Sequence, residues 1–250
     1  GSIARFENTG AAENPVWKLV EERISASFSS VNRRVQRTID VGGHAAPALV
    51  DIDGDGDLDL VVGAADGRLF FFRNTGTKQL PVFELVTERL VAPEMGDHLV
   101  PVFQDINGDR APDLILGNGA GDVYLLINQG RIAEPAFCSA LPPTDPDAEP
   151  RCKPAPRLVA SIRPEIHAAS ALADWDGDGD FELFVGKSDG TIDYYENRGT
   201  RTEPDWRLTQ PRFLAIDDGG YAAPTFLDVN GAGKPDLIVG NSSSALALYT

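Results

Sequence analysis

The stretch Asp51-Ile-Asp53-Gly-Asp55-Gly-Asp57-Leu-Asp59 runs directly into the apolar segment Leu60-Val-Val-Gly63. Its aspartates stand at every second position, with glycines at the fourth and sixth. This spacing suits a hard cation that takes about six to eight oxygen ligands, because glycine lets the chain curl around the ion. So many neighbouring carboxylates would repel one another without a counter-charge. The stretch therefore predicts a calcium-binding loop rather than a solvated acidic turn.

The acidic loop occurs four times along the chain. The first ligands of the four loops are Asp51, Asp105, Asp174 and Asp228, which are separated by 54, 69 and 54 residues. The predicted calcium ligands are the side chains at positions 1, 3, 5 and 9 and the backbone carbonyl at position 7. In the first three loops they are Asp51, Asp53, Asp55, Asp57 and Asp59, then Asp105, Asn107, Asp109, Ala111 and Asp113, then Asp174, Asp176, Asp178, Asp180 and Glu182. These loops are not EF-hands, because an apolar residue replaces the bidentate Glu that an EF-hand has at position 12.

The fourth loop departs from this pattern. It keeps Asp228, Asn230 and Asp236, but Ala232 removes the ligand at position 5 and Lys234 adds a positive charge. We expect this loop to bind calcium weakly or not at all. Asp228 and Asp236 are then expected to accept hydrogen bonds from the turn backbone or to pair with Lys234.

A longer repeat surrounds each loop. Every unit opens with a histidine or an aromatic residue, followed by a small apolar strand, the loop and a strand that ends in glycine. In the first three units a third strand, an Asn-x-Gly turn and a fourth strand that begins with a large aromatic residue (Phe83, Phe137 or Trp206) come next. Four short strands every ~50 residues predict the blades of a β-propeller, because each small sheet can bury its faces only against its neighbours. We therefore predict an all-β fold of four to five blade units, each a four-stranded antiparallel sheet.

We divide this single propeller domain into five segments. Residues 1–43 form a half-blade of third and fourth strands with a connecting segment, and residues 44–97, 98–166, 167–220 and 221–250 form the four blade units. The second unit carries an insertion and the fourth is incomplete. The two half-blades are expected either to join as a closing blade or to leave room for the rest of a larger ring or for a second chain.

On these loops and strands, the chain resembles the FG-GAP/VCBS repeat family, which includes the calcium-loop propellers of integrin α-subunit heads and some lectins. The resemblance covers nearly the whole chain. It implies that each acidic loop joins the first and second strands of a blade, and that a complete ring commonly has seven blades. The loops at Asp51 and Asp174 match the family pattern, with Glu182 in place of the usual Asp, whereas the second loop has Arg110 where Gly is expected.

The composition limits the classes of partner. The formal net charge of −16 over 250 residues argues against nucleic acid and against an anionic membrane surface. No apolar run approaches ~20 residues, so no membrane insertion is expected, and the N-terminus shows no signal peptide. Cys138 and Cys152 bracket a proline-rich insertion and are predicted to form a disulfide. Together with calcium loops this pair indicates an extracellular, cell-surface or periplasmic location.

The repeat itself argues against catalysis. His44, His98 and His167 occupy one register position that they share with Tyr221, which predicts a packing or bracing role rather than a unique catalytic base. Each tryptophan likewise shares its register with apolar residues and is expected in the core. We therefore predict a non-catalytic domain that binds an extracellular protein or glycan. A lectin with sites between blades and the propeller of a secreted polysaccharide lyase are the alternatives. The segments 21–38 and 138–157 vary most between units, and both are expected between a fourth strand and the next first strand, on one rim.

Overall fold

The computed structural model describes residues 2–11, 16–30, 33–91, 95–130, 135–137, 156–162, 166–216, 219–243 and 246–250. The described chain is all-β apart from short 3-10 turns such as η2 (Phe213–Ala215). No helix in this part of the chain is long and apolar enough to cross a membrane.

The strands form five sheets. A hairpin pairs β1 (Arg5–Asn8) with β2 (Trp17–Glu21). The six-stranded sheet contains, in spatial order, β4 (Arg33–Thr38), β3 (Ser25–Ser30), β8 (Phe83–Thr87), β7 (Leu69–Asn74), β6 (Asp59–Gly63) and β5 (Ala46–Val50). The next sheet contains β12 (Arg157–Ser161), β11 (Asp122–Leu126), β10 (Asp113–Gly117) and β9 (Val100–Gln104), followed by the sheet of β13 (Ala169–Ala173), β14 (Glu182–Gly186), β15 (Ile192–Asn197) and β16 (Trp206–Gln210). The last sheet has three strands, β17 (Ala223–Leu227), β18 (Asp236–Gly240) and β19 (Leu246–Tyr249).

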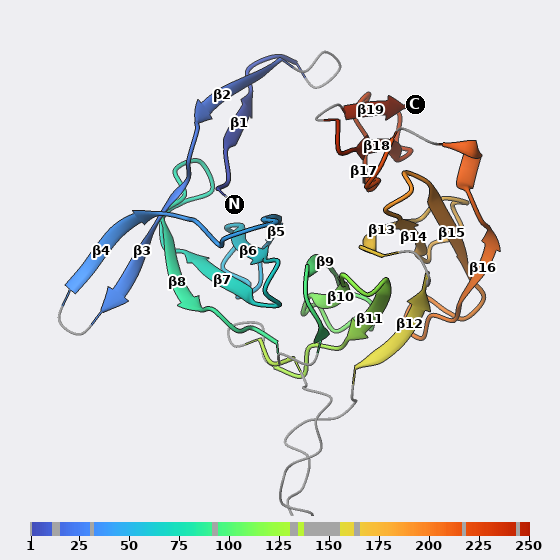
Figure 1. The fold of residues 1–250 in the computed structure, drawn as a ribbon, viewed down its shortest axis with the longest axis horizontal. Coiled ribbons are helices and arrows are strands. Elements are labelled where there is room, and N and C mark those ends of the chain that lie inside the picture. The colour runs from blue at the N-terminus through green and yellow to red at the C-terminus, as the bar shows by residue number, and fades with distance from the viewer. Residues whose placement is uncertain are drawn as a thin grey trace, which may run out of the picture.

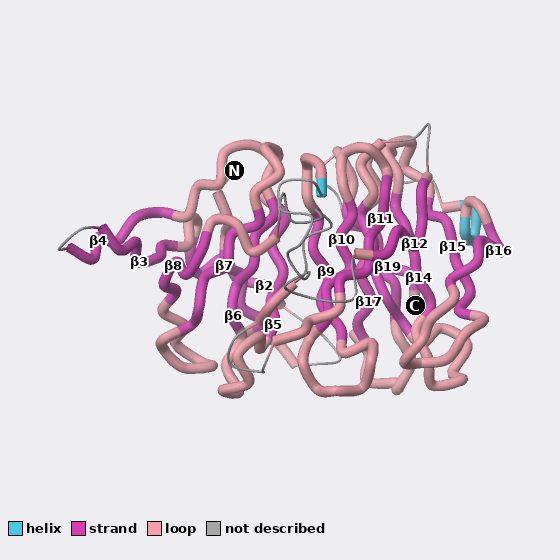
Figure 2. The backbone as a smooth tube through the Cα atoms, turned by 90° about the horizontal axis from the view of Figure 1, so that it is seen from below, coloured by secondary structure: helices cyan, strands magenta, loops and turns pink. Residues whose placement is uncertain are grey.

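The sheets follow one another around a common axis, as the blades of a propeller do (Figure 1). In the view at 90° most strands run between the two faces of the ring (Figure 2). The first strand of each unit lies innermost, since a central cavity of about 590 Å³ is lined by β5, β9, β13 and β17. Within each unit the strands pair antiparallel in chain order, so the polypeptide passes from the axis outward and returns to the axis for the next blade.

The apolar cores lie between neighbouring blades. Val61 and Phe71 of the first four-stranded unit pack with Leu114 and Leu116 of the second, and equivalent clusters join the second to the third and the third to the fourth. All residues of β6, β10 and β14 are buried. A strand covered on both faces favours a continuous apolar run, which is the pattern that follows each acidic loop.

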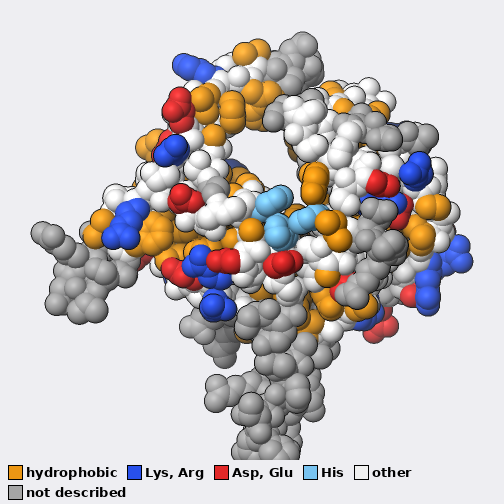
Figure 3. Space-filling view, in the orientation of Figure 1, with side chains coloured by type: hydrophobic (Ala, Val, Ile, Leu, Met, Phe, Trp, Pro, Cys, Tyr) orange, Lys and Arg blue, Asp and Glu red, His pale blue; other side chains and the backbone are white. Residues whose placement is uncertain are grey.

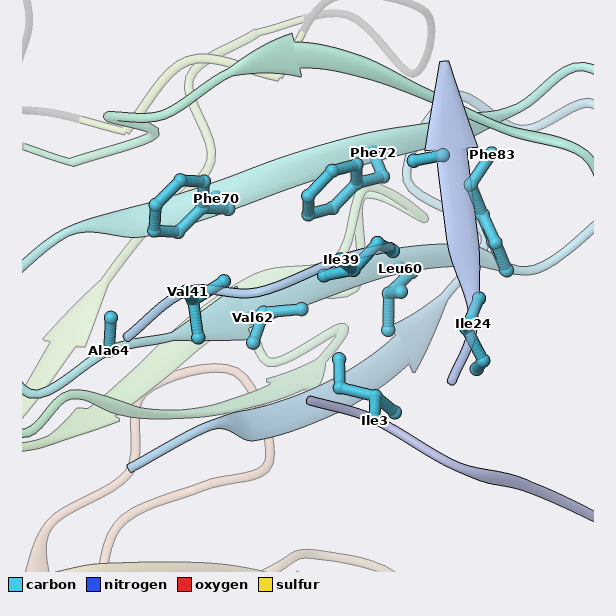
Figure 4. Packing of buried hydrophobic residues seen from close by; sticks show 11 residues of the cluster. Ile3, Ile24, Ile39, Val41, Leu60, Val62, Ala64, Phe70, Phe72 and Phe83 are labelled. Atoms are coloured by element: carbon cyan, nitrogen blue, oxygen red, sulfur yellow. The ribbon is translucent and has the colours of Figure 1, made fainter. Parts of the chain in front are cut away.

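The N-terminal segment covers the outer face of the first blade. This face carries Leu60 and Val62 of β6, with Phe70 and Phe72 of β7 (Figure 4). The separate sheet that precedes this blade in the chain is the two-stranded hairpin β1–β2. The residues that cover it are Ile3, Ile24, Ile39 and Val41. The first blade is therefore buried on both sides even though only a hairpin precedes it.

The glycine that ends each second strand permits close contact with the next blade. A Cβ on Gly63, Gly117 or Gly186 would lie well under 3.0 Å from the backbone carbonyl of Leu99, Ala168 or Ala222, respectively. Gly240 holds the same register position in the last sheet, where a Cβ would meet nothing closer than 3.5 Å. Blade-to-blade packing thus requires glycine at Gly63, Gly117 and Gly186, but not at Gly240.

The prediction that the insertion of the second unit follows the fourth strand was wrong. Phe137 pairs with Asn128, as Phe83 pairs with Asn74, but the rest of the fourth strand is β12, beyond the insertion. The insertion therefore interrupts the outermost strand of its blade instead of following it. Cys138 and Cys152 lie outside the described residues.

The other variable segment contains the hairpin β3–β4, in which β3 pairs in parallel with β8 and so extends the outer edge of the first blade.

The two half-blades form separate sheets within the described residues. The hairpin β1–β2 and the sheet β17–β19 nevertheless line one pocket of about 340 Å³, which includes Asn8 and Trp17 on one side and Leu246 on the other. Trp17 is 62% exposed and Leu246 is 79% exposed. The expectation that Trp17 is a core residue was wrong, because no complete blade covers its hairpin.

Candidate functional site

Each acidic loop connects the first and second strands of its blade. In all four loops the first aspartate caps the turn: Asp51, Asp105, Asp174 and Asp228 each accept a backbone N–H from a residue three or four positions later. The residue at position 9 closes the loop, because its carboxylate accepts the N–H of position 2 in every copy. These repeated bonds fix the carboxylates at the same place in each blade.

The first loop brings three carboxylates together. Ligand oxygens of Asp51, Asp53 and Asp59 lie within 4.8 Å of one another. Asp59 is fully buried and also accepts the Asn74 N–H at 2.7 Å. Burial, followed by the charges of neighbouring aspartates, raises the pKa of Asp59 to about 6 despite these hydrogen bonds. Arg73 partly offsets this charge through an ion pair with Asp53 at 3.0 Å.

The third loop has the densest group of carboxylates. Asp174, Asp176 and Glu182 converge within 4.8 Å, and so do Asp178, Asp180 and Glu182. Burial, followed by the nearby aspartates, raises the pKa of Glu182 to about 7. One oxygen of Asp180 is buried without a hydrogen-bond partner. A cation in this loop would satisfy that oxygen and stabilise the ionised carboxylates, so the residues fit calcium.

The second loop is arranged differently. Arg110, which replaces the usual glycine, adopts a left-handed backbone with φ of 73°. The amide of Asn107 donates to Asp109 at 2.9 Å, so this side chain turns its donor toward a predicted ligand. Burial raises the pKa of Asp113, as it does at the equivalent Asp59. Asp105, Asn107, Asp109 and Asp113 share one loop, in which Asn107 replaces the carboxylate that Asp53 and Asp176 contribute to the close groups of the first and third loops.

The fourth loop is held by its own hydrogen bonds. Asp228 accepts the N–H groups of Ala232 and Gly233, at 2.9 and 2.8 Å. Asp236 accepts the Val229 N–H and the side-chain amide of Asn230. The prediction that these carboxylates bond to the turn backbone is confirmed. Whether this loop or the others bind calcium stays a prediction.

The positions of Asp55 and Asp57 differ from those of the converging carboxylates. Asp55 is exposed and accepts the Asp57 N–H at 2.9 Å, whereas Asp57 was assigned only its backbone carbonyl. The structure therefore places Asp51, Asp53 and Asp59 together and leaves Asp55 and Asp57 at the rim of the loop. In the third loop, by contrast, Asp178 and Asp180 join the group through Glu182.

A second cluster lies at the other end of the innermost strands. His44, His98, His167 and Tyr221 precede β5, β9, β13 and β17, and their rings meet around the axis. Figure 3 shows the histidines at the edge of the central opening. Burial, followed by the neighbouring His98 and His44, lowers the pKa of His167. The sequence shows that these four residues share one register position, but we did not predict that they meet. In a propeller, residues at this position of every first strand lie at the axis.

The FG-GAP-like repeat family matches residues 51–116 and 174–239, which together make up more than half of the chain. The chain belongs to the FG-GAP-like repeat family. The matched regions begin at the first and third acidic loops and extend through the second and fourth to the strands that follow. No curated protein sequence matches the chain.

Three solved structures are similar to this FG-GAP-like chain at low identity. A crystal structure of BBS1N in complex with ARL6DN, soaked with mercury, is 16% identical with a TM-score of 0.36, and covers 85% of this chain and 59% of its own. The lead-soaked crystal of the same complex is 14% identical with a TM-score of 0.31, covering 84% and 59%. A chain of the Photorhabdus luminescens Tc holotoxin pore is 15% identical with a TM-score of 0.38, covering 99% and 14%. The present chain thus spans less than two thirds of each of these chains.

Proposed function

We propose that this chain is a calcium-stabilised propeller domain that acts outside the cytoplasm as a non-catalytic binding module for a protein or a glycan. The observation that carries the calcium part is the third loop, where Glu182 stands between two pairs of aspartates. A buried oxygen of Asp180 without a hydrogen-bond partner and the raised pKa of Glu182 both indicate that this loop lacks a counter-charge.

Calcium binding would stabilise the propeller by linkage. An ion that binds only the folded state contributes about 2.7 kcal/mol per site at a concentration 100-fold above its Kd. For a chain of this size, each kcal/mol corresponds to about 2–4 °C in melting temperature, so one saturated site adds about 5–11 °C. The ligands at positions 1 and 9 flank the loop between the first two strands, so an ion there would hold the inner strands of the blade together.

Calcium titration of chelator-treated protein tests this part of the proposal. We expect heat of binding in the wild type, and loss of one site in Glu182→Gln, which keeps the shape of the side chain but removes its charge. Asp236→Asn is the matched control, because it changes the same register position in the loop that has lost its position-5 ligand. Equal calcium binding by Glu182→Gln and wild type would contradict the assignment.

The binding role rests on the surfaces that the blades leave open. The hairpin β3–β4 and the two ends of the insertion, at Phe137 and Arg157, lie at outer edges of their blades. At these edges the sequence differs most between the repeat units. Variable loops on a rigid scaffold commonly bind the partner of a protein. Deleting Ser139 to Glu149 is expected to keep calcium-dependent stability and reduce partner capture. Deleting residues 25–38 is expected to reduce partner capture as well but to lower stability, because it removes the buried Ala26 and the pairing of β3 with β8.

Carbohydrate binding is the second candidate, and Trp17 favours it. Trp17 is 62% exposed and lines a pocket that also contains Asn8, so an aromatic surface stands beside a polar side chain. A glycan array with wild type and Trp17→Ala separates the candidates. Glycan binding lost in Trp17→Ala would favour the lectin, whereas protein capture lost only in the deletion variants would favour an adhesion module.

A further inference from the structure

The three histidines of the chain are its only ones, and all of them meet at the axis. The ring centres of His44 and His98 lie 4.7 Å apart, those of His98 and His167 lie 4.6 Å apart, and those of His44 and His167 lie 5.7 Å apart. The cluster lines a cavity of about 560 Å³ at one mouth of the central channel. Imidazole side chains from three different blades are therefore brought together by the ring itself.

The backbone holds these side chains in place by a repeated device. His44, His98 and His167 have left-handed φ values of 50°, 48° and 60°. Such a conformation costs about 1–3 kcal/mol for a residue other than glycine, and it persists where surrounding structure enforces it. Here the enforcement comes from the preceding blade, because the N–H of His98 donates to Ala65 O at 3.2 Å and that of His167 donates to Gly119 O at 3.3 Å.

We propose that His44, His98 and His167 form a binding site for one divalent transition-metal ion, such as zinc, at this mouth of the channel. Zinc binds imidazole nitrogen at about 2.0–2.1 Å in tetrahedral geometry, which places the centres of its imidazole ligands roughly 5 Å apart. The observed separations of 4.6, 4.7 and 5.7 Å bracket that value. Tetrahedral zinc with three protein ligands keeps its fourth position for water or a bound molecule, and the open cavity provides that space.

One step of adjustment is needed for the metal to bind. Among the described residues, the groups of three ligand atoms within 4.8 Å of one another are all carboxylates. The imidazoles must therefore turn to aim one nitrogen each at a common point. This rotation is about χ2, a broad torsion in histidine, and the cavity beside the rings leaves room for it.

A carboxylate lies beside His98, in the place where a metal-binding histidine usually has a hydrogen-bond acceptor. The Nδ1 of His98 is buried without a hydrogen bond and lies 3.5 Å from Asp97 Oδ1. Metal-binding histidines usually donate their second ring N–H to a carboxylate, which fixes the tautomer and the ring orientation. Asp97 would thus orient His98 so that Nε2 faces the metal. Tyr221 completes the cluster by packing on His167, with ring centres 5.2 Å apart.

This site is distinct from the calcium loops in position and chemistry. The histidines precede the innermost strands and the acidic loops follow them, so the two kinds of site lie on opposite faces of the ring. Imidazole suits zinc, copper and nickel, whereas carboxylate and carbonyl oxygens suit calcium. Saturating calcium is therefore expected to fill the loops and leave the histidine site free for zinc.

Zinc titration in saturating calcium tests the proposal. We expect one zinc ion per chain, and binding at least ~100-fold weaker in His98→Asn. Asn is the replacement of choice because it tolerates the left-handed backbone and so preserves folding. Asp97→Asn is expected to weaken zinc roughly 10-fold through loss of orientation, and Tyr221→Phe is expected to leave it unchanged. Unchanged melting in calcium serves as the folding control for each variant.

Proton NMR of the imidazoles gives a readout that does not depend on any variant. Because the chain has only three histidines, every imidazole signal reports on this cluster. We expect all three to shift when one equivalent of zinc is added in saturating calcium. Absence of any shift, or equal zinc affinity in wild type and His98→Asn, would overturn the proposal. The failure of calcium binding in the loops would be seen separately, in the calcium titration.

Discussion

Replacing Gly117 by alanine tests the blade-to-blade packing directly. A Cβ at this position would lie well under 3.0 Å from the carbonyl oxygen of Ala168, which is backbone and not the end of a flexible side chain. The second and third blades must therefore separate at the axis to relieve the overlap. Two interblade hydrogen bonds lie at this point, from Ala168 N to Asn118 O at 3.1 Å and from His167 N to Gly119 O at 3.3 Å.

The expected loss of stability combines overpacking with the weakening of two hydrogen bonds. Such substitutions commonly cost about 1–3 kcal/mol, and weakening the two interblade hydrogen bonds adds about 0.5–1.5 kcal/mol for each. We therefore expect Gly117→Ala to lose about 2–6 kcal/mol, which corresponds to a fall of about 4–24 °C in melting temperature. Chemical denaturation and thermal melting, both in excess calcium, measure the two quantities.

Gly240→Ala is the matched control. Gly240 ends the second strand of the last sheet in the same register, but a Cβ there would make its closest contact with Leu246 at 3.5 Å, an ordinary van der Waals distance. We expect this variant to change stability by less than about 1 kcal/mol. Equal losses of stability in the two variants would refute the reasoning. The cost of the substitution would then come from the strand itself and not from contact with the next blade.

Four further outcomes are expected. In calcium-free protein, the free energy of unfolding should fall as pH rises from about 4.5 to 7. The raised pKa values of Asp59 (about 6) and Glu182 (about 7) let the folded state bind more protons than the unfolded state in that range. Denaturation in EGTA at pH 5 and 7.5 measures this difference, and a stability that rises with pH would contradict the prediction. Arg73→Met should raise the calcium affinity of the first loop by up to about 5-fold, because it removes the cation paired with Asp53; weaker binding in titration calorimetry would show that Arg73 does not compete with calcium. Trp175 is 37% exposed, so the expectation that it lies in the core was wrong; Trp175→Ala should still destabilise by about 1–3 kcal/mol because its ring packs on Phe184, Phe213 and Phe226, and a melting temperature equal to wild type would show that the ring is not structural. Cys138 and Cys152 are expected to form a disulfide that folding does not require; two titratable thiols in the native protein, or a double Ser variant that fails to fold, would oppose this.

The sequence predicted the repeat and its strands well because the signal is local. Asp-Gly alternation, apolar runs and Asn-x-Gly turns each act within a few residues, and they place the strands before and after every loop of the structure. The fourth strand of the second unit was missed because the aromatic residue that starts it, Phe137, is separated from its continuation at Arg157 by the insertion. Pairing across such a gap is a tertiary contact that local propensity does not contain.

The sequence predicted which residues form the acidic loops, but not how the side chains are arranged differently from loop to loop. The ligands Asp51, Asp53 and Asp59 converge, whereas the second loop has Asn107 at the position of Asp53 and so has one carboxylate fewer to bring together. There Asn107 donates to Asp109, and that choice between two amide orientations is invisible in the spacing of residues. The meeting of the histidines at the axis required knowledge that first strands lie innermost, which follows from the ring and not from any single unit.

The central claim is that calcium holds this propeller together, and the melting temperature with and without calcium tests it most directly. Chelator-treated protein is melted in excess EGTA and again in millimolar calcium, with magnesium at the same concentration as the ionic control. The account predicts a rise of at least about 5 °C in calcium, corresponding to one saturated site. Identical melting curves in EGTA and calcium would contradict it.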